Sequence, residues 1–280
     1  MADLDTRRFP FRADLAAAHL RGQVEAPRYA EGVAHQVSAG VAPLRARPSV
    51  TAMQETQLLF GEGFTVYDEA DGYAWGQSAL DGYVGYVDLA ALSAPVVAPT
   101  HRVVALRTYV YSEPNLKSAP YFLLSLNAQV TPEGREGRYV KLARTGWVTD
   151  NVIAPFDHSE PDWVAVAERF LHTPYQWGGR ESLGLDCSGL VQSAMHAAGL
   201  PCPRDSDMQA AELGQPIPVD LSALRRGDLI CWKGHIGIML DGERLLHANA
   251  HHMATAIEPV AVAAARIEPI AGPITTVRRL

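Results

Sequence analysis

A change of pattern near Pro155 most constrains how this chain folds. Before it, from about residue 36, short β-rich runs alternate with turn residues, such as Asp71-Gly72 between aromatic β-formers. An Asp-Gly pair in this setting predicts a hairpin. After it, helical runs come first and strands follow, which is the order of an α+β domain. The 280 residues therefore predict more than one domain, with β-barrels first and an α+β domain last.

The β-rich part divides into two similar units. Residues 85–89 (GYVDL) are echoed at 146–150 (GWVTD), one small barrel's length later. We expect an N-terminal arm over residues 1–35, small antiparallel barrels over 36–97 and 98–155, and an α+β domain over 156–280. Within the arm, residues 13–22 predict a short helix that Gly22 ends.

Charge and cysteine content exclude several classes of function. With 31 acidic against 24 basic residues, the net charge of -7 disfavours nucleic acid and anionic membranes as partners. No run is long and apolar enough to span a bilayer, and the acidic N-terminus does not resemble a secretory signal. Three cysteines are an odd, sparse set, which indicates a reducing compartment. We therefore expect a cytoplasmic protein.

The first candidate for chemistry is a cysteine at the start of a predicted helix. Helical spacing over residues 187–198 places Cys187 on the same buried face as the apolar residues of the following turns. A helix N-terminus favours a thiolate, and a thiolate is the nucleophile that acyl transfer needs. The alternative is that Cys187 is a small buried hydrophobe, which is our interpretation of Cys202 and Cys231.

Two histidines on predicted strands are the candidate partners of this cysteine. His235 lies in the run 228–240 and His247 in the run 243–249. A two-residue loop at Asp241-Gly242 places the two side chains on opposite faces of the sheet, whereas a three-residue loop places them on one face. A Cys–His–His relay requires the three-residue loop, while the sequence slightly favours the shorter one.

Metal binding is the rival use of cysteine and histidine. The chain has no C-x-x-C spacing, so we expect neither a metal nor another cofactor. His251 and His252 are adjacent and would alternate faces on a strand, so we interpret them as surface or loop residues.

The motifs in the last third carry a family resemblance. They are YQWGG at 175–179, DCSGL at 186–190, GDL at 227–229, GHIGI at 234–238 and LHA at 246–248. By their order and spacing, residues 160–270 resemble the NlpC/P60 family of cysteine peptidases, which has a papain-like α+β fold. The two β units before them resemble bacterial SH3-like (SH3b) domains. This domain order is similar to that of γ-D-glutamyl-L-diamino acid endopeptidases.

The resemblance implies an activity and a set of site residues. The implied reaction cuts the γ-D-Glu–diamino acid bond of murein tri- or tetrapeptides that have a free N-terminal L-Ala. Cys187 is implied as nucleophile, His235 as base and His247 as the group that orients His235. Six further residues are implied to bind substrate: Tyr83, Tyr175, Asp186, Ser188, Asp205 and Ser206.

Some of these assignments have alternatives. Asp205 would pair with the α-ammonium of L-Ala, but an aspartate here also fits a loop or a helix cap. Tyr83 also fits a barrel aromatic. Gly234 departs from relatives of the recycling type, which often carry a histidine there, and this leaves the finer substrate preference open. An SH3b module that binds peptidoglycan beside an inactive domain, or amidase or acyl-transferase chemistry at the same site, are the alternative functions.

Overall fold

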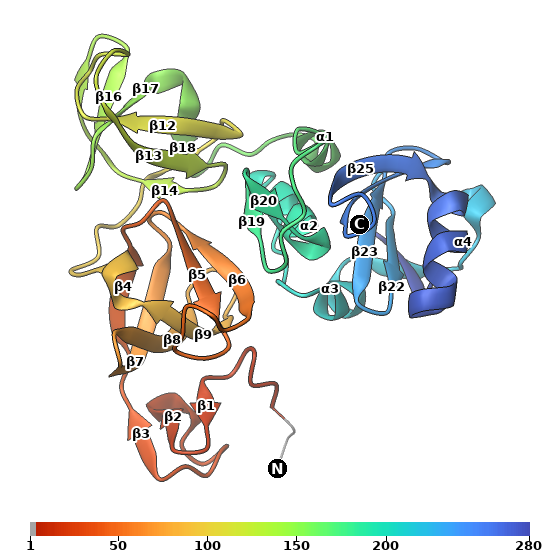
Figure 1. The fold of residues 1–280 in the computed structure, drawn as a ribbon, viewed down its shortest axis with the longest axis horizontal. Helices are drawn as coiled ribbons and strands as arrows, with labels where there is room; N and C mark the ends of the chain where they lie inside the picture. Colours follow the sequence, from red (N-terminus) through yellow and green to blue (C-terminus); the bar gives the residue numbers. More distant parts are fainter. Residues whose placement is uncertain (1–3) are drawn as a thin grey trace. The chain divides into compact units, whose positions relative to one another are not determined.

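The chain folds into two compact units, one ending at Phe156 and the other beginning at Asp157 (Figure 1). This computed structural model describes residues 4–280. The first unit is built from strands and short 3-10 turns, and the second adds α-helices, so the predicted α+β class is confirmed. Within residues 4–280, no helix combines the length and apolar character that crossing a bilayer requires.

The N-terminal segment forms a small sheet, and the helix predicted at 13–22 was wrong. The sheet contains β1 (Phe11–Arg12), β2 (Leu15–Ala17) and β3 (Arg28–Ala30) in that order, with a 3-10 turn at Ala18–Leu20. All three residues of β2 are fully buried. Three consecutive residues cover more than one face of a helix, so a strand that is covered on both sides satisfies this run better.

The first barrel is a seven-stranded antiparallel sheet. Its strands are β4 (Val33–Val37), β5 (Val41–Arg45), β6 (Gln54–Leu59), β7 (Gly63–Ala70), β8 (Tyr73–Ser78), β9 (Val84–Asp88) and β10 (Leu92–Ser93). They lie in the order β10-β4-β7-β8-β9-β5-β6. The predicted hairpin is present, because Ala70 pairs with Tyr73 and both turn residues, Asp71 and Gly72, have positive φ.

The second barrel repeats part of the first. Its strands are β11 (His101–Val103), β12 (Arg107–Tyr111), β13 (Pro120–Ser125), β14 (Gln129–Val130), β15 (Pro132–Glu136), β16 (Tyr139–Leu142), β17 (Trp147–Thr149) and β18 (Ile153–Pro155). In both barrels a strand, a 3-10 turn and a strand follow one another, as β9–β10 and β17–β18. The pairing of Tyr111 with Trp147 matches that of Arg45 with Tyr86, so the weak sequence echo reflects a structural repeat.

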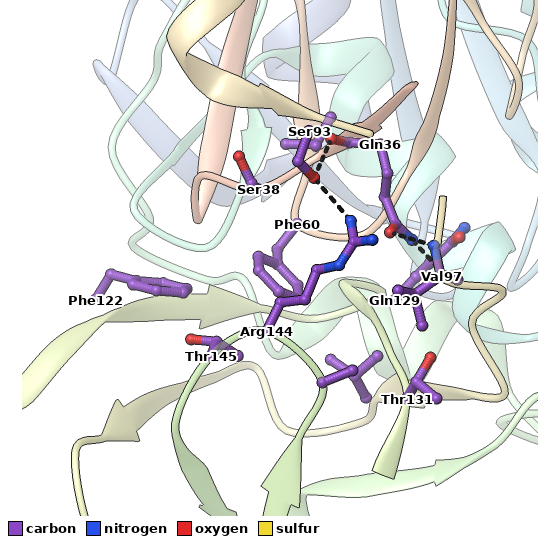
Figure 2. Close-up of a pocket in the computed structure, with 13 residues that line it drawn as sticks. Gln36, Ser38, Phe60, Ser93, Val97, Phe122, Gln129, Thr131, Arg144 and Thr145 are labelled. Carbon is purple, nitrogen blue, oxygen red and sulfur yellow. Dashed lines mark hydrogen bonds between the residues drawn. The ribbon is translucent and has the colours of Figure 1, made fainter. Parts of the chain in front are cut away.

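The two barrels of this unit share a hollow that side chains bridge (Figure 2). The Gln36 amide donates to the carbonyls of Gly61 and Val97, both at 2.9 Å, and accepts from the Val97 N–H at 3.1 Å. From the second barrel, the Arg144 guanidinium reaches the Ser93 hydroxyl at 3.4 Å. The Arg144–Ser93 contact therefore joins the two barrels, while Gln36 ties the segment at Val97 to the first barrel.

The second unit is built on a six-stranded antiparallel sheet. Its strands are β21 (Gln215–Ile217), β22 (Leu229–Trp232), β23 (His235–Met239), β24 (Arg244–Asn249), β25 (Ala254–Pro259) and β26 (Thr276–Arg279), in the order β21-β26-β22-β23-β24-β25. The other elements are α1 (Trp163–Glu168), β19 (Arg180–Glu181), β20 (Gly184–Leu185), α2 (Cys187–Ala197), α3 (Ser206–Glu212) and α4 (Val260–Ala271). Figure 1 shows α2 and α4 on either side of β22 and β23, so the sheet is covered by both helices.

Candidate active site

Cys187 is the first residue of α2, as the sequence predicts. The Asp186 carboxylate caps this helix by accepting from the Gly189 N–H at 2.7 Å. The thiol is nearly buried, with 7% of the residue exposed. The Ile236 backbone N–H hydrogen-bonds to the sulfur. Since Ile236 follows His235 on β23, this contact places the thiol at the strand that carries the candidate base.

The thiol is held in its neutral form. Burial and then the Asp186 carboxylate raise the pKa of the Cys187 thiol to about 12, while the Ile236 N–H and the Arg204 charge oppose that rise. This differs from the expectation that the helix N-terminus favours a thiolate, because loss of solvent outweighs the partial charge of the helix end. Cys187 therefore needs a neighbouring base before it can act as a nucleophile.

The hairpin register brings the two histidines together, and the shorter loop that the sequence slightly favoured was wrong. Ile238 pairs with Leu246, and the Leu240 N–H donates to the Arg244 carbonyl at 2.8 Å, so three residues form the loop. Asp241 stabilises this longer loop, because its carboxylate accepts from the N–H groups of Glu243 and Arg244. His235 and His247 consequently lie on one face of the sheet.

A chain of hydrogen bonds runs from His235 through His247 to Glu258. His235 Nε2 lies 2.8 Å from His247 Nδ1, and His247 Nε2 lies 2.8 Å from an oxygen of Glu258. The Arg266 guanidinium pairs with the same oxygen of Glu258. His247 is fully buried. Because Nε2 of His235 is engaged in this chain, its other ring nitrogen, Nδ1, is the one left for a proton from the thiol.

Burial keeps both imidazoles neutral. It lowers the pKa of His235 to about 4, with a further contribution from the Arg266 charge. It lowers the pKa of His247 to about 2, with a further contribution from the charge on His235. The resting site thus holds a neutral thiol, bonded to the N–H of the residue after His235, and a neutral imidazole that can act as a base.

We expect the imidazole NMR signals of His235 and His247 to stay constant from pH 8 to about 5, and those of His235 to change only near pH 4. The sign follows from the cause: a lowered pKa keeps the ring unprotonated, and able to act as a base, until the pH falls through that lower value. A titration followed by two-dimensional 1H–13C spectra checks this. A midpoint of His235 near the ordinary value of about 6.5 would contradict it.

Asp186 and Ser188 are tied to a buried arginine that the sequence analysis did not single out. Arg204, which is 1% exposed, forms a two-bond pair with the Asp186 carboxylate at 3.0 and 2.8 Å. It also donates to the Ser188 hydroxyl at 2.8 Å. Asp186 further accepts from the Gly178 N–H at 2.8 Å. These contacts hold the turn before Cys187 in place, and the predicted substrate contacts of Asp186 and Ser188 stay predictions.

Tyr175 lies within electrostatic reach of the thiol. Burial, followed by the negative charges of Cys187 and Asp186, raises the pKa of the Tyr175 phenol above its usual range. The phenol therefore keeps its proton and is available as a hydrogen-bond donor near the cysteine. Its role in binding an oxyanion stays a prediction.

The other predicted substrate residues lie in two places. Asp205 and Ser206 are half-buried at the start of α3, and the Asp205 side chain does not cap that helix. Tyr83 lies in the first unit, where it is 3% exposed and packs with Val37 and Phe64 in the barrel core. This is the barrel-aromatic alternative for Tyr83, and its contact with substrate stays a prediction.

The local backbone explains why position 234 is a glycine. Trp232 pairs with His235, so Lys233 and Gly234 alone connect β22 to β23. Gly234 has a φ of 74°, in the left-handed region that glycine adopts at the lowest cost. The tight turn thereby sets the position of His235 at the start of β23.

Three side chains are close enough to share a metal ion. Ligand atoms of His247, His252 and Glu258 lie within 4.8 Å of one another. His247 and Glu258 already hydrogen-bond to each other, and His252 Nδ1 lies 3.0 Å from the Asn249 side-chain oxygen. An ion would have to replace the His247–Glu258 contact, so the cluster is engaged as part of the histidine chain. His251 and His252 are exposed and lie in a turn, as predicted.

Glu258 and Arg266 were missed by the sequence analysis. A signal for Glu258 was present, because a second hairpin turning at residues 250–253 pairs His247 with Ala256. Side chains two apart on a strand share a face, so Glu258 lies on the His247 face. Arg266 carries no such signal, since its approach depends on how α4 packs.

Family models match two parts of the chain. The model described as the bacterial dipeptidyl-peptidase SH3 domain matches residues 44–92, within the first barrel. The model described as the NlpC/P60 family matches residues 172–265, which include Cys187, both histidines and Glu258.

Curated relatives match parts of the chain. The chain is 36% identical over 95 residues to gamma-D-glutamyl-L-lysine dipeptidyl-peptidase of Bacillus subtilis, covering 31% of each chain. It is 34% identical over 87 residues to dipeptidyl-peptidase 6 of Lysinibacillus sphaericus, again covering 31% of each. The matched segment thus spans about a third of the length of these relatives.

Solved structures show the same fold at low identity. An NlpC/P60 family protein from Bacillus cereus superposes with a TM-score of 0.74 and 18% identity, over 88% of this chain and 99% of that one. An NlpC/P60 endopeptidase from Photobacterium damselae gives a TM-score of 0.62 and 12% identity, over 88% and 71% of the two chains. At these identities the likeness concerns the fold.

Proposed function

The second unit is an NlpC/P60 domain, and from this we propose that the chain is a cysteine endopeptidase that cuts the γ-D-Glu–diamino acid bond of murein tri- or tetrapeptides. The observation that carries the proposal is a thiol at a helix N-terminus that bonds to the Ile236 N–H, next along the strand from a neutral His235 imidazole that a second imidazole holds. Such a pair performs acyl transfer by forming a covalent intermediate.

The proposed reaction has two halves. Nδ1 of His235 takes the thiol proton as the Cys187 sulfur attacks the γ-carbonyl carbon of D-Glu. The same nitrogen then gives that proton to the leaving amine of the diamino acid, and a thioester remains. Water, deprotonated by His235, cleaves the thioester and releases the free thiol. His247 acts by holding the imidazole of His235 in position.

The proposed substrate has a free N-terminal L-Ala. Two relatives are named as dipeptidyl-peptidases, and one of these names specifies gamma-D-glutamyl-L-lysine. Release of a dipeptide suits a site that recognises an ammonium group, and a carboxylate recognises it best. We assign that role to Asp205. None of the three cysteines forms a disulfide, and this supports the cytoplasm as the proposed place of action.

We expect purified protein to cut L-Ala-γ-D-Glu-diaminopimelate after D-Glu and to leave the N-acetylated peptide intact. Asp205→Asn should lower kcat/KM on the free peptide by about 10- to 100-fold, because a charge-assisted hydrogen bond is lost. Asp207→Asn, an exposed neighbour on α3, is the matched control and should behave as wild type. Mass spectrometry of the products reads both results.

Other results of this cleavage assay would change the proposal in different ways. Equal cleavage of both peptides would keep the peptidase and remove the selection of the amine. If neither peptide is cut by folded protein, the proposed activity is wrong, and the peptidoglycan-binding or acyl-transferase functions become the ones to test.

A further inference from the structure

We propose that Glu258, held by Arg266, is a positioning residue that sets the direction of hydrogen bonding through His247 and His235 and so leaves Nδ1 of His235 unprotonated for Cys187. The inference deepens the proposed function and rests on its assignment of Cys187 and His235. It concerns two residues outside the implied Cys–His–His set, and it is carried by the geometry of one hairpin and one ion pair.

The placement of Glu258 follows from strand pairing. On β24 and β25, His247 pairs with Ala256, so Glu258 is the diagonal neighbour of His247 on the same face. The Glu258 side chain is 11% exposed, and its contact with the fully buried His247 side chain measures 2.8 Å. A carboxylate with so little solvent needs partners, and His247 and Arg266 supply them.

The donor-to-acceptor direction of these hydrogen bonds follows from counting the protons on the two imidazoles. Each neutral imidazole carries one N–H, so the contact between His235 Nε2 and His247 Nδ1 works with the proton on either atom. If the proton is on His247 Nδ1, then His247 Nε2 presents a lone pair to a carboxylate oxygen, and the two repel. If it is on His235 Nε2, then His247 Nε2–H donates to Glu258. The contact with the Glu258 carboxylate oxygen therefore selects the second arrangement.

The selected arrangement is the productive one. With its proton on Nε2, His235 has a lone pair on Nδ1 and can accept the thiol proton. In the reversed arrangement Nδ1 of His235 already carries a proton, and the ring cannot act as a base toward Cys187. The Glu258 carboxylate, which is separated from the thiol by two histidines, thus decides whether Nδ1 of His235 is unprotonated and can act as a base.

Arg266 holds the Glu258 carboxylate in place. The guanidinium on α4 pairs with the same carboxylate oxygen that His247 contacts. The other charged or titratable groups that act on the two rings are Asp186 on His235, and His251 and His252 on His247. Only Glu258 bonds to His247 Nε2 among the contacts in residues 4–280.

Long-range 1H–15N NMR of the full chain, labelled at histidine nitrogens, tests the proposal without any substrate. We expect both His235 and His247 to show the proton on Nε2 and a bare Nδ1 at pH 7, with signals assigned through His235→Gln and His247→Gln. Glu258→Ala should give a mixture of tautomers, whereas Glu258→Gln should keep the wild-type pattern through its amide oxygen. Finding the proton on Nδ1 of His247 in the wild-type protein would overturn the proposal, even if no variant folds.

Kinetics supply the second readout. Glu258→Ala should lower kcat by about 10- to 100-fold with little change in KM, and Glu258→Gln should recover about tenfold of that loss. Glu268→Ala, an exposed glutamate on the same helix as Arg266, is the control and should match wild type. Equal losses for alanine and glutamine would reject the acceptor role. The NMR experiment does not depend on hydrolysis. It therefore decides the tautomers of His235 and His247 even if the peptide assay shows no cleavage.

Discussion

Replacing Cys187 by alanine is expected to reduce peptide hydrolysis by about 10,000-fold or more, to the level of background. The reason is that no other group in the described site can form the covalent intermediate at the same position. Cys187 is the first residue of α2. Its sulfur accepts a hydrogen bond from the N–H of Ile236, the residue after the candidate base His235. Loss of one sulfur atom leaves a small void, so the fold should be retained at a cost of about 1 kcal/mol.

The control for this variant is another buried cysteine. Cys202 forms no disulfide and is 5% exposed, and its sulfur contacts the Gln209 amide at 3.3 Å. Cys202→Ala removes a thiol of similar burial and should keep turnover near that of wild type. Product formation is followed by mass spectrometry, and circular dichroism confirms folding. Hydrolysis that persists in folded Cys187→Ala would move the nucleophile to another residue.

Replacing Arg204 by methionine is expected to lower the free energy of unfolding of the second unit by about 3–5 kcal/mol. Methionine fills similar space but leaves the Asp186 carboxylate without its cation, in a site where the arginine side chain is 1% and the aspartate side chain 9% exposed. Because Asp186 also caps α2 through the Gly189 N–H, the position of Cys187 should loosen with it. We therefore expect a loss of turnover alongside the loss of stability.

The matched control is an ion pair on the surface. Arg244 pairs with Asp241, and their side chains are 59% and 42% exposed. Arg244→Met should change stability by less than about 1 kcal/mol, because water screens the charges. Differential scanning calorimetry is the measurement, since it can separate transitions of the two units. If both variants shift the second unit's transition equally, the buried pair has no special weight.

The order of motifs was enough to predict the second unit and the position of Cys187 in it. Helical spacing after Cys187 placed the thiol at the first residue of α2, and the structure confirms it. The Asp71-Gly72 hairpin also followed from local chemistry alone. These features depend on residues near one another in sequence, where backbone preference and side-chain period act directly.

The N-terminal arm shows where prediction from local backbone preference and side-chain period fails. Residues 13–22 have helix-forming composition, but Leu15–Ala17 are buried on consecutive positions and form a strand. The arm just before this segment is bonded to the first barrel, since the Val84 N–H donates to the Arg7 carbonyl and the Gln77 amide to that of Arg8. Those contacts come from residues far along the chain, so the local pattern did not contain them.

The sequence by itself determined which residues are available for chemistry: a cysteine before an apolar helix, and two histidines on neighbouring strands. Only the tertiary structure decided how they work. One residue more in the loop after Leu240 placed both histidines on one face, and the packing of β25 and α4 added Glu258 and Arg266 behind them. The helix end suggested a thiolate, but burial made the thiol neutral. Register, desolvation and ion pairing depend on atoms brought together by folding, whereas spacing and side-chain type are properties of the chain itself.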